Sequence, residues 1–153
     1  MQLLLPLEIR EQIENALREA GYREIGGILM AEHIAENAFR VQSLTIQRRG
    51  GSYAAFLRAV EAFIGPLKNF FRRTDYNYTK FNYIGEWHSH PSFVPTPSQT
   101  DHQTMLSIIN DSQTGALFIV LLIVKLDEHG KFVGTVTVYQ PEAQAFKGEL
   151  ILE

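Results

Sequence analysis

The chain has 153 residues, of which 45% are hydrophobic, and its acids and bases are interspersed around a formal net charge of −3. This length suits one well-buried core, so we expect a single domain over residues 1–153. The absence of cysteine excludes disulfides, a thiolate zinc site and a cysteine nucleophile. No basic stripe is present to bind nucleic acid. No apolar run approaches the roughly 20 residues of a membrane span, and the start MQLLLPLEIREQ lacks secretory features, so we expect a cytoplasmic protein without a membrane partner.

The first third of the chain predicts a helix followed by a hairpin. Pro6 suits the first turn of a helix whose apolar residues recur at helical spacing, and Gly21 is a suitable stop. The segments Glu24–Ile34 and Ala38–Gln47 are rich in apolar residues and are separated by a short polar turn. They predict two strands joined as a hairpin.

The rest of the chain predicts two more helices and four more strands. The segment Tyr53–Arg73 has helical spacing, although Gly65-Pro66 should interrupt or kink it. A strand is expected over Phe81–His88, and a helix should begin near Ser98. The remaining strands are expected at Leu117–Lys125, Lys131–Tyr139 and Gln144–Leu152. The order predicts an α/β fold with a mixed sheet flanked by helices.

The segment between Glu86 and Asp101 carries the chemistry. His88 and His90 are separated by one residue, so on an extended strand both imidazoles project from the same face. Pro91 and six further residues lead to Ser98, and Asp101 follows three positions later, so the loop can bring a carboxylate back to the histidines. Two nitrogens and one oxygen leave a fourth position open on zinc, which is typical of a catalytic site. The pattern predicts metal-assisted hydrolysis.

The full spacing, His88-x-His90-Pro91, six residues, Ser98, two residues and Asp101, resembles the signature of the JAMM (JAB1/MPN/Mov34) zinc metalloprotease family. The form GEWHSHP and the chain length resemble its small stand-alone prokaryotic members. The resemblance implies the MPN/JAB fold, with its cytidine-deaminase-like arrangement, and Zn²⁺ held by His88, His90 and Asp101. It also implies that Glu24, just where an early apolar strand begins, is the general base and then the general acid. Ser98 is placed to donate its hydroxyl to the developing oxyanion.

Other interpretations of these residues stay open. Glu24 on its own would be a surface glutamate, whereas Glu86 has the same strand parity as the two histidines and is an alternative base or a supporting residue. Ser98 and Asp101 also fit a helix-capping box. We expect Ser89 to support the ligand loop and Trp87 to pack in the core, and we treat His33 and His102 as surface or supporting groups.

The expected partner also comes from the resemblance. The family cleaves amide or isopeptide bonds after the C-terminus of ubiquitin-like proteins, which implies deconjugation or precursor processing in a bacterial ubiquitin-like or antiviral defence pathway with E1-like and E2-like enzymes. Two alternatives remain open. One is a peptidase that processes a sulfur-carrier protein or its cysteine adduct, and the other is a non-catalytic scaffold of the MPN type.

Overall fold

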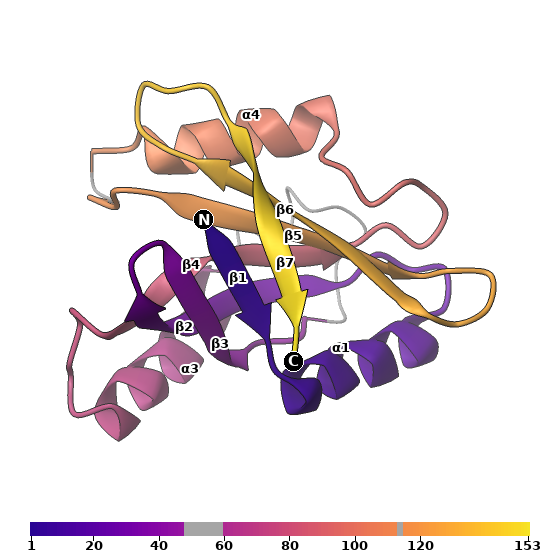
Figure 1. Cartoon of the computed structure of the whole chain (residues 1–153), viewed down its shortest axis with the longest axis horizontal. Helices are drawn as coiled ribbons and strands as arrows, with labels where there is room; N and C mark the ends of the chain where they lie inside the picture. The colour runs from indigo at the N-terminus through magenta and orange to yellow at the C-terminus, as the bar shows by residue number, and fades with distance from the viewer. Residues whose placement is uncertain (48–59, 113–114) are drawn as a thin grey trace.

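The computed structural model describes residues 1–47, 60–112 and 115–153. Its strands close a barrel in the order β1-β3-β2-β4-β5-β6-β7, with helices packed against it (Figure 1). The strands are β1 (Gln2–Leu5), β2 (Gly26–Ala35), β3 (Ala38–Leu44), β4 (Phe81–Ser89), β5 (Ile119–Leu126), β6 (Phe132–Tyr139) and β7 (Phe146–Leu152). The helices are α1 (Leu7–Ala20), α3 (Val60–Arg73) and α4 (Gln99–Ile109). Within these described ranges, no helix is both long enough and apolar enough to cross a membrane.

The sheet is mixed. β4 pairs antiparallel with β2 and parallel with β5, and β5 pairs antiparallel with β6. The expected fold class, an α/β arrangement with a mixed sheet and flanking helices, is confirmed. Strand β1 was not expected, and it pairs in parallel with both β3 and β7 to close the barrel.

The long apolar run of β5 packs against a different hydrophobic cluster on each face of the strand. Val120, Leu122 and Val124 belong to the main cluster, which also holds the α1 residues Ile9, Ile13 and Leu17. The alternate residues of β5, Ile119, Leu121 and Ile123, face outward and pack with Met105 and Ile109 of α4. Because side chains of a strand alternate between its two faces, β5 is buried on both sides and carries almost no polar residue.

Helix α3 continues through Gly65-Pro66 to Arg73, so the expected interruption does not end it. Phe70, which is 2% exposed, packs on Ile28 and Met30 of β2. Burial of this apolar face stabilises the helix beyond the proline and outweighs the one backbone hydrogen bond that a proline removes. The part of the predicted helix before Val60 lies outside the described residues.

A bulge in β4 requires a glycine. The pairing of β2 with β4 shifts between Leu29 and Met30, and Gly85 opposite Leu29 has a φ of 143°. A Cβ atom on Gly85 would lie 2.0 Å from the carbonyl oxygen of Val120 on β5. Only glycine fits this position, and the side chains from Glu86 onward keep a regular alternation up to the end of the strand.

Candidate metal centre

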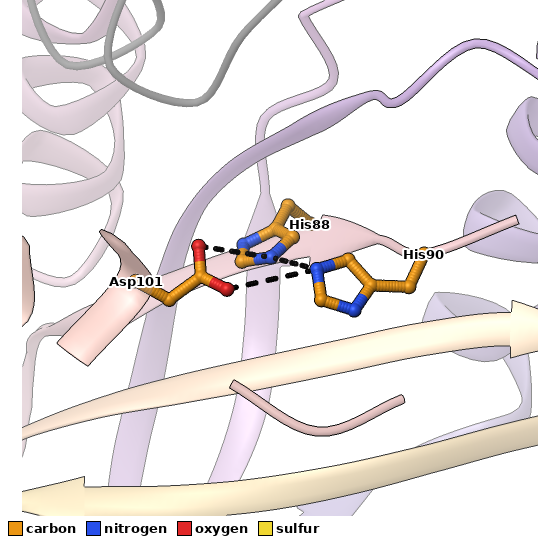
Figure 2. A group of neighbouring side chains, drawn as sticks. All are labelled: His88, His90 and Asp101. Atoms are coloured by element: carbon orange, nitrogen blue, oxygen red, sulfur yellow. Dashed lines mark hydrogen bonds and ion pairs between the residues drawn. The ribbon is translucent and has the colours of Figure 1, made fainter. Parts of the chain in front are cut away.

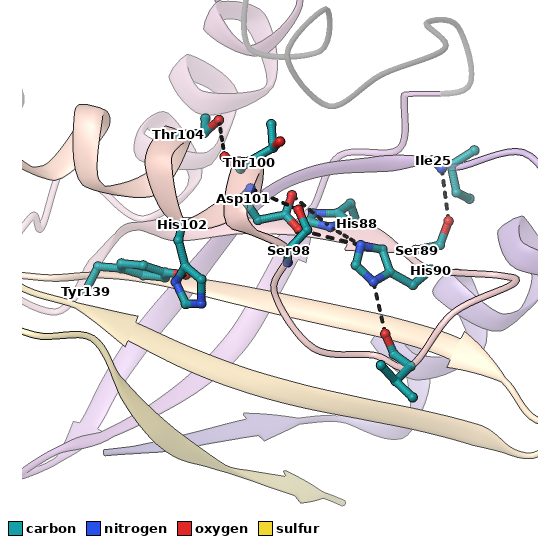
Figure 3. Close-up of polar contacts among 11 residues, drawn as sticks. Ile25, His88, Ser89, His90, Ser98, Thr100, Asp101, His102, Thr104 and Tyr139 are labelled. Carbon is teal, nitrogen blue, oxygen red and sulfur yellow. Dashed lines mark hydrogen bonds and ion pairs between the residues drawn. The ribbon is translucent and has the colours of Figure 1, made fainter.

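The two histidines lie at the carboxyl end of β4, on either side of Ser89. His88 and His90 are 3% and 8% exposed. The Ser89 Oγ accepts a hydrogen bond from the Ile25 N–H at 3.0 Å, and the Ser89 N–H donates to the Ile25 carbonyl at 2.8 Å (Figure 3). The His90 N–H donates to the Val124 carbonyl at 2.9 Å. The segment is therefore tied on both sides, to the start of β2 and to β5, and Ser89 supports it as expected.

Gly26 leaves the space that His88 occupies. The two residues are directly opposite in the antiparallel pairing of β2 with β4. A Cβ on Gly26 would lie 2.9 Å from the Cβ of His88 and 2.3 Å from the Trp87 carbonyl oxygen. Trp87 itself points into the main core, and its Nε1 donates to the Thr45 carbonyl at 2.9 Å, as expected for a packing residue.

Asp101 comes to the histidines from the first turn of α4, where it also takes part in a capping box. The Ser98 Oγ accepts from the Asp101 N–H at 3.2 Å, and the Ser98 N–H donates to Asp101 Oδ2 at 2.7 Å. The same carboxylate is 4% exposed and faces both imidazoles. Ser98 and Asp101 therefore form a helix-capping box and also contribute to the candidate metal site, because the hydrogen bonds of the cap orient the carboxylate toward the histidines.

The ligand atoms converge at distances that suit one small cation (Figure 2). The Nε2 atoms of His88 and His90 are 3.0 Å apart. Asp101 Oδ1 is 3.5 Å from the first and Oδ2 is 3.6 Å from the second. Ligands about 2.0 to 2.1 Å from a tetrahedral zinc lie about 3.3 to 3.4 Å from one another. The residues present thus fit a metal ion held by two nitrogens and one oxygen.

The tautomer of His90 is set by the loop that follows it. His90 Nδ1 is 3.1 Å from the carbonyl oxygen of Val94. A carbonyl only accepts, so Nδ1 carries the hydrogen and donates it. In the neutral ring, Nε2 then presents its lone pair to His88 and Asp101, which is the state that a metal ligand needs.

Asp101 supplies a negative charge to the cluster. Burial opposes its ionisation, but the hydrogen bond and the charge interaction with His88, together with hydrogen bonds from Ser98, outweigh burial and lower the pKa of Asp101 to about 2. A buried carboxylate beside two imidazoles is costly unless a positive charge compensates it. Two imidazole nitrogens and one ionised carboxylate are also a donor set that suits a divalent cation.

Glu24, the expected base, lies just before β2. It is exposed and precedes β2 by two residues, whereas a place at the strand's first residue was expected. The pairing of Gly26 with His88 continues through the hydrogen bonds between Ile25 and Ser89, so the register places Glu24 opposite His90.

Glu86, the alternative base, is 3% exposed. Burial raises the pKa of the Tyr83 hydroxyl, and the charge of Glu86 and a hydrogen bond between the two side chains raise it further. A protonated phenol therefore donates to the Glu86 carboxylate, which suits a supporting residue.

The other histidines differ in their surroundings. His33 stacks on Phe39 with ring centres 4.8 Å apart, near the opposite end of β2. His102 lies beside the cluster, and its Nδ1 is 2.9 Å from the Tyr139 hydroxyl (Figure 3). Burial raises the pKa of Tyr139 and the charge of Asp101 adds to this, so the phenol keeps its proton in its hydrogen bond with His102. Tyr139 was not found from the sequence, because no local spacing connects it to a residue 37 positions away.

The fold and the cluster together define a mixed-sheet barrel with a candidate metal centre at the carboxyl end of β4. The chain belongs to the family described as prokaryotic homologs of the JAB domain, which matches residues 6–136. Residues His88, His90, Ser98 and Asp101 all lie within the matched range.

One relative and two solved structures illustrate the likeness. A protein of Enterobacter hormaechei named CD-NTase/cGAS isopeptidase is 30% identical over 125 residues, which cover 80% of this chain and 66% of that protein. A solution structure from Desulfitobacterium hafniense has a TM-score of 0.61 at 19% identity, covering 99% of this chain and 92% of that one. A solution structure from Salinibacter ruber has a TM-score of 0.55 at 18% identity, covering 97% and 90%. At these identities the two structures are similar in fold alone.

Proposed function

We propose that this chain is a zinc-dependent isopeptidase or peptidase that hydrolyses the bond after the C-terminus of a ubiquitin-like protein. The observation that carries the proposal is the buried convergence of His88, His90 and Asp101 within a chain of the JAB family. An intact set of three ligand side chains argues against the alternative of a non-catalytic scaffold.

Each residue has a definite task in this proposal. His88, His90 and Asp101 hold Zn²⁺, which when bound supplies a water of lowered pKa and polarises the scissile carbonyl. Glu24 takes the proton of the attacking water and returns it to the leaving amine. The Ser98 Oγ accepts from the Asp101 amide, so its own hydroxyl hydrogen is available to donate to the carbonyl oxygen as negative charge develops there.

The substrate class is inferred from the relative. The name of the Enterobacter hormaechei protein assigns it an isopeptidase activity connected with CD-NTase/cGAS. We infer that the present chain acts on a conjugate of the same kind, in which a ubiquitin-like protein is joined to a target through an isopeptide bond. Such a conjugate needs E1-like and E2-like enzymes to form it, and these are the proposed partners. The name favours this substrate over a sulfur-carrier protein or its cysteine adduct.

The test compares wild type with Glu24→Gln, which keeps the size and polarity of the side chain and removes the base. We expect one zinc per chain in both proteins, and a loss of about 10² to 10⁴ in the rate at which a ubiquitin-like protein fused to a C-terminal reporter is released. Glu11→Gln, at an exposed position on α1, is the matched control and should cleave at the wild-type rate.

Each result decides a different part of the proposal. Unchanged turnover in Glu24→Gln contradicts the assignment of the base. Zinc without cleavage of any ubiquitin-like fusion, but with release of a sulfur-carrier adduct, selects that alternative substrate. Protein that takes up no zinc supports the scaffold.

A further inference from the structure

The loop between β4 and α4, residues 91–97, connects the two histidines to Asp101, and its backbone is held by side chains. Three consecutive carbonyl oxygens of the loop each accept a hydrogen bond from a side chain. The donors are Lys125 Nζ to Phe93 at 3.1 Å, His90 Nδ1 to Val94 at 3.1 Å, and Thr135 Oγ1 to Pro95. We call these three contacts the carbonyl clamp.

The clamp reaches across the sheet. His88 on β4 pairs with Ile123 on β5, and Ile123 pairs with Thr135 on β6, so the three residues form one row. Neighbouring strands are about 4.8 Å apart, which places Thr135 roughly two strand spacings from His88. The loop therefore crosses over β5 and is held at Pro95, only three residues before the Ser98 cap of α4.

No buried apolar side chain of the loop replaces these bonds. Phe93 and Val94 are 65% and 69% exposed, and Ser92 and Thr96 are also exposed. The loop thus lacks the apolar burial that usually holds a segment against its core. Its conformation depends on its prolines, on the backbone hydrogen bonds from the Phe93 N–H to the His90 carbonyl and from the Thr96 N–H to the Val94 carbonyl, and on the carbonyl clamp.

We propose that Lys125 and Thr135 are positioning residues that preorganise the metal centre. They hold the loop where the Val94 carbonyl selects the Nδ1–H tautomer of His90 and where the first turn of α4 directs Asp101 toward the histidines. This inference rests on the metal site proposed above. If the loop is not held, it must become ordered when the metal binds. The apparent affinity for zinc then equals the intrinsic affinity multiplied by the fraction of molecules whose loop is already ordered.

The first test measures zinc affinity by competition with a chromophoric chelator. Thr135→Val removes the hydroxyl donor at nearly constant shape, and we expect zinc to bind about 10- to 100-fold more weakly, the usual cost of losing a group that orients a ligand. Thr135→Ser keeps the donor and should bind like wild type. Thr137→Val, two residues along β6 on the same face, is the matched control and should also bind like wild type.

Lys125→Met provides an independent second variant, because it removes the ammonium and keeps the apolar stem. It should weaken zinc binding in the same range, while Lys131→Met in the exposed turn before β6 should not. If Thr135→Val fails to fold, the Lys125 pair decides the question.

A spectroscopic measurement separates positioning from general stability. In metal-free protein labelled with ¹⁵N-histidine, wild-type His90 should show a single Nδ1–H tautomer, and Thr135→Val and Lys125→Met should show a mixture while their thermal midpoints stay close to wild type. The proposal is overturned if both variants keep the wild-type tautomer and zinc affinity. It is also overturned if Thr135→Ser binds zinc as weakly as Thr135→Val. Zinc alone is the probe, so absence of protease activity would leave this result unaffected.

Discussion

Asp101 contributes both to the stability of α4 and to the candidate metal centre. Its amide and carboxylate complete the capping box of α4 with Ser98, while the carboxylate oxygens face His88 and His90. A single substitution that removes the whole side chain would therefore confuse a loss of helix stability with a loss of metal binding. The two contributions can be separated by choosing which atoms are removed.

Asp101→Asn should lose metal while largely keeping the helix cap. The amide oxygen of asparagine still accepts from the Ser98 N–H, but the negative charge is gone, so zinc content should fall well below one per chain. Ser98→Ala should show the opposite pattern, because losing the Oγ acceptor costs about 1 kcal/mol of stability while the Ser98 N–H still holds the Asp101 carboxylate. Zinc content by atomic spectroscopy and thermal midpoints of both variants test this. Full zinc loading of Asp101→Asn contradicts the ligand assignment.

Pairing between β2 and β4 sets the position of the first histidine. A methyl group on Gly26 would meet the backbone oxygen of Trp87 and the Cβ of His88, neither of which can move without disturbing the strand. We expect Gly26→Ala to lower both thermal stability and zinc affinity, with stability reduced by about 1 to 3 kcal/mol as for other overpacked positions. Denaturant unfolding and zinc competition measure the two effects.

Gly134→Ala is the control for this substitution. Gly134 also lies in a strand, but its added Cβ would meet the mobile end of the Leu150 side chain at 2.9 Å, which can rotate away. Its stability should therefore decrease less than that of Gly26→Ala. An equal decrease in both variants, with zinc affinity unchanged in Gly26→Ala, would remove the special role given to position 26.

The elements could be predicted from the sequence where their signals are local. The histidine pair on β4 lies within one strand, and the Ser98–Asp101 cap lies within one helical turn. The apolar run of β5 indicates that both of its faces are buried. Strand β1 was missed because the four residues Gln2–Leu5, directly before Pro6, are too few to show a periodicity of their own. The contact of Thr135 with Pro95 and that of Tyr139 with His102 join distant segments, so only the closed sheet brings them together.

Closure of the barrel depends on β1 at the scale of the whole molecule. Leu3 is 0% exposed in the main core cluster, and its strand joins β3 to β7. Leu3→Ala should reduce the free energy of unfolding by about 2 to 5 kcal/mol, because a cavity remains in a core that the surrounding strands cannot fill. Leu7→Ala, at a position 48% exposed, should change it by no more than about 0.5 kcal/mol. Similar losses in both variants would show that β1 contributes little to the closed barrel.

The same closure is bridged at the surface by an ion pair between Arg40 on β3 and Glu153 after β7. The guanidinium donates to both carboxylate oxygens, at 2.9 and 2.8 Å. The hydrogen bond and charge of Arg40 lower the pKa of Glu153, so the folded state favours the ionised form. This contribution to stability is present above the pKa of an unfolded glutamate and is lost as the pH falls through the lower pKa of the folded state.

Arg40→Gln should therefore lower the thermal midpoint slightly at neutral pH, and the difference from wild type should shrink as the pH falls to about 3, below the ordinary pKa of a glutamate. Added salt at neutral pH should shrink it as well, because exposed charges are screened. Thermal melts of both proteins across this pH range, at low and high salt, provide the measurement. A difference that stays constant with pH and salt would mean that Arg40 acts through the packing of its stem on the barrel surface and not through its charge.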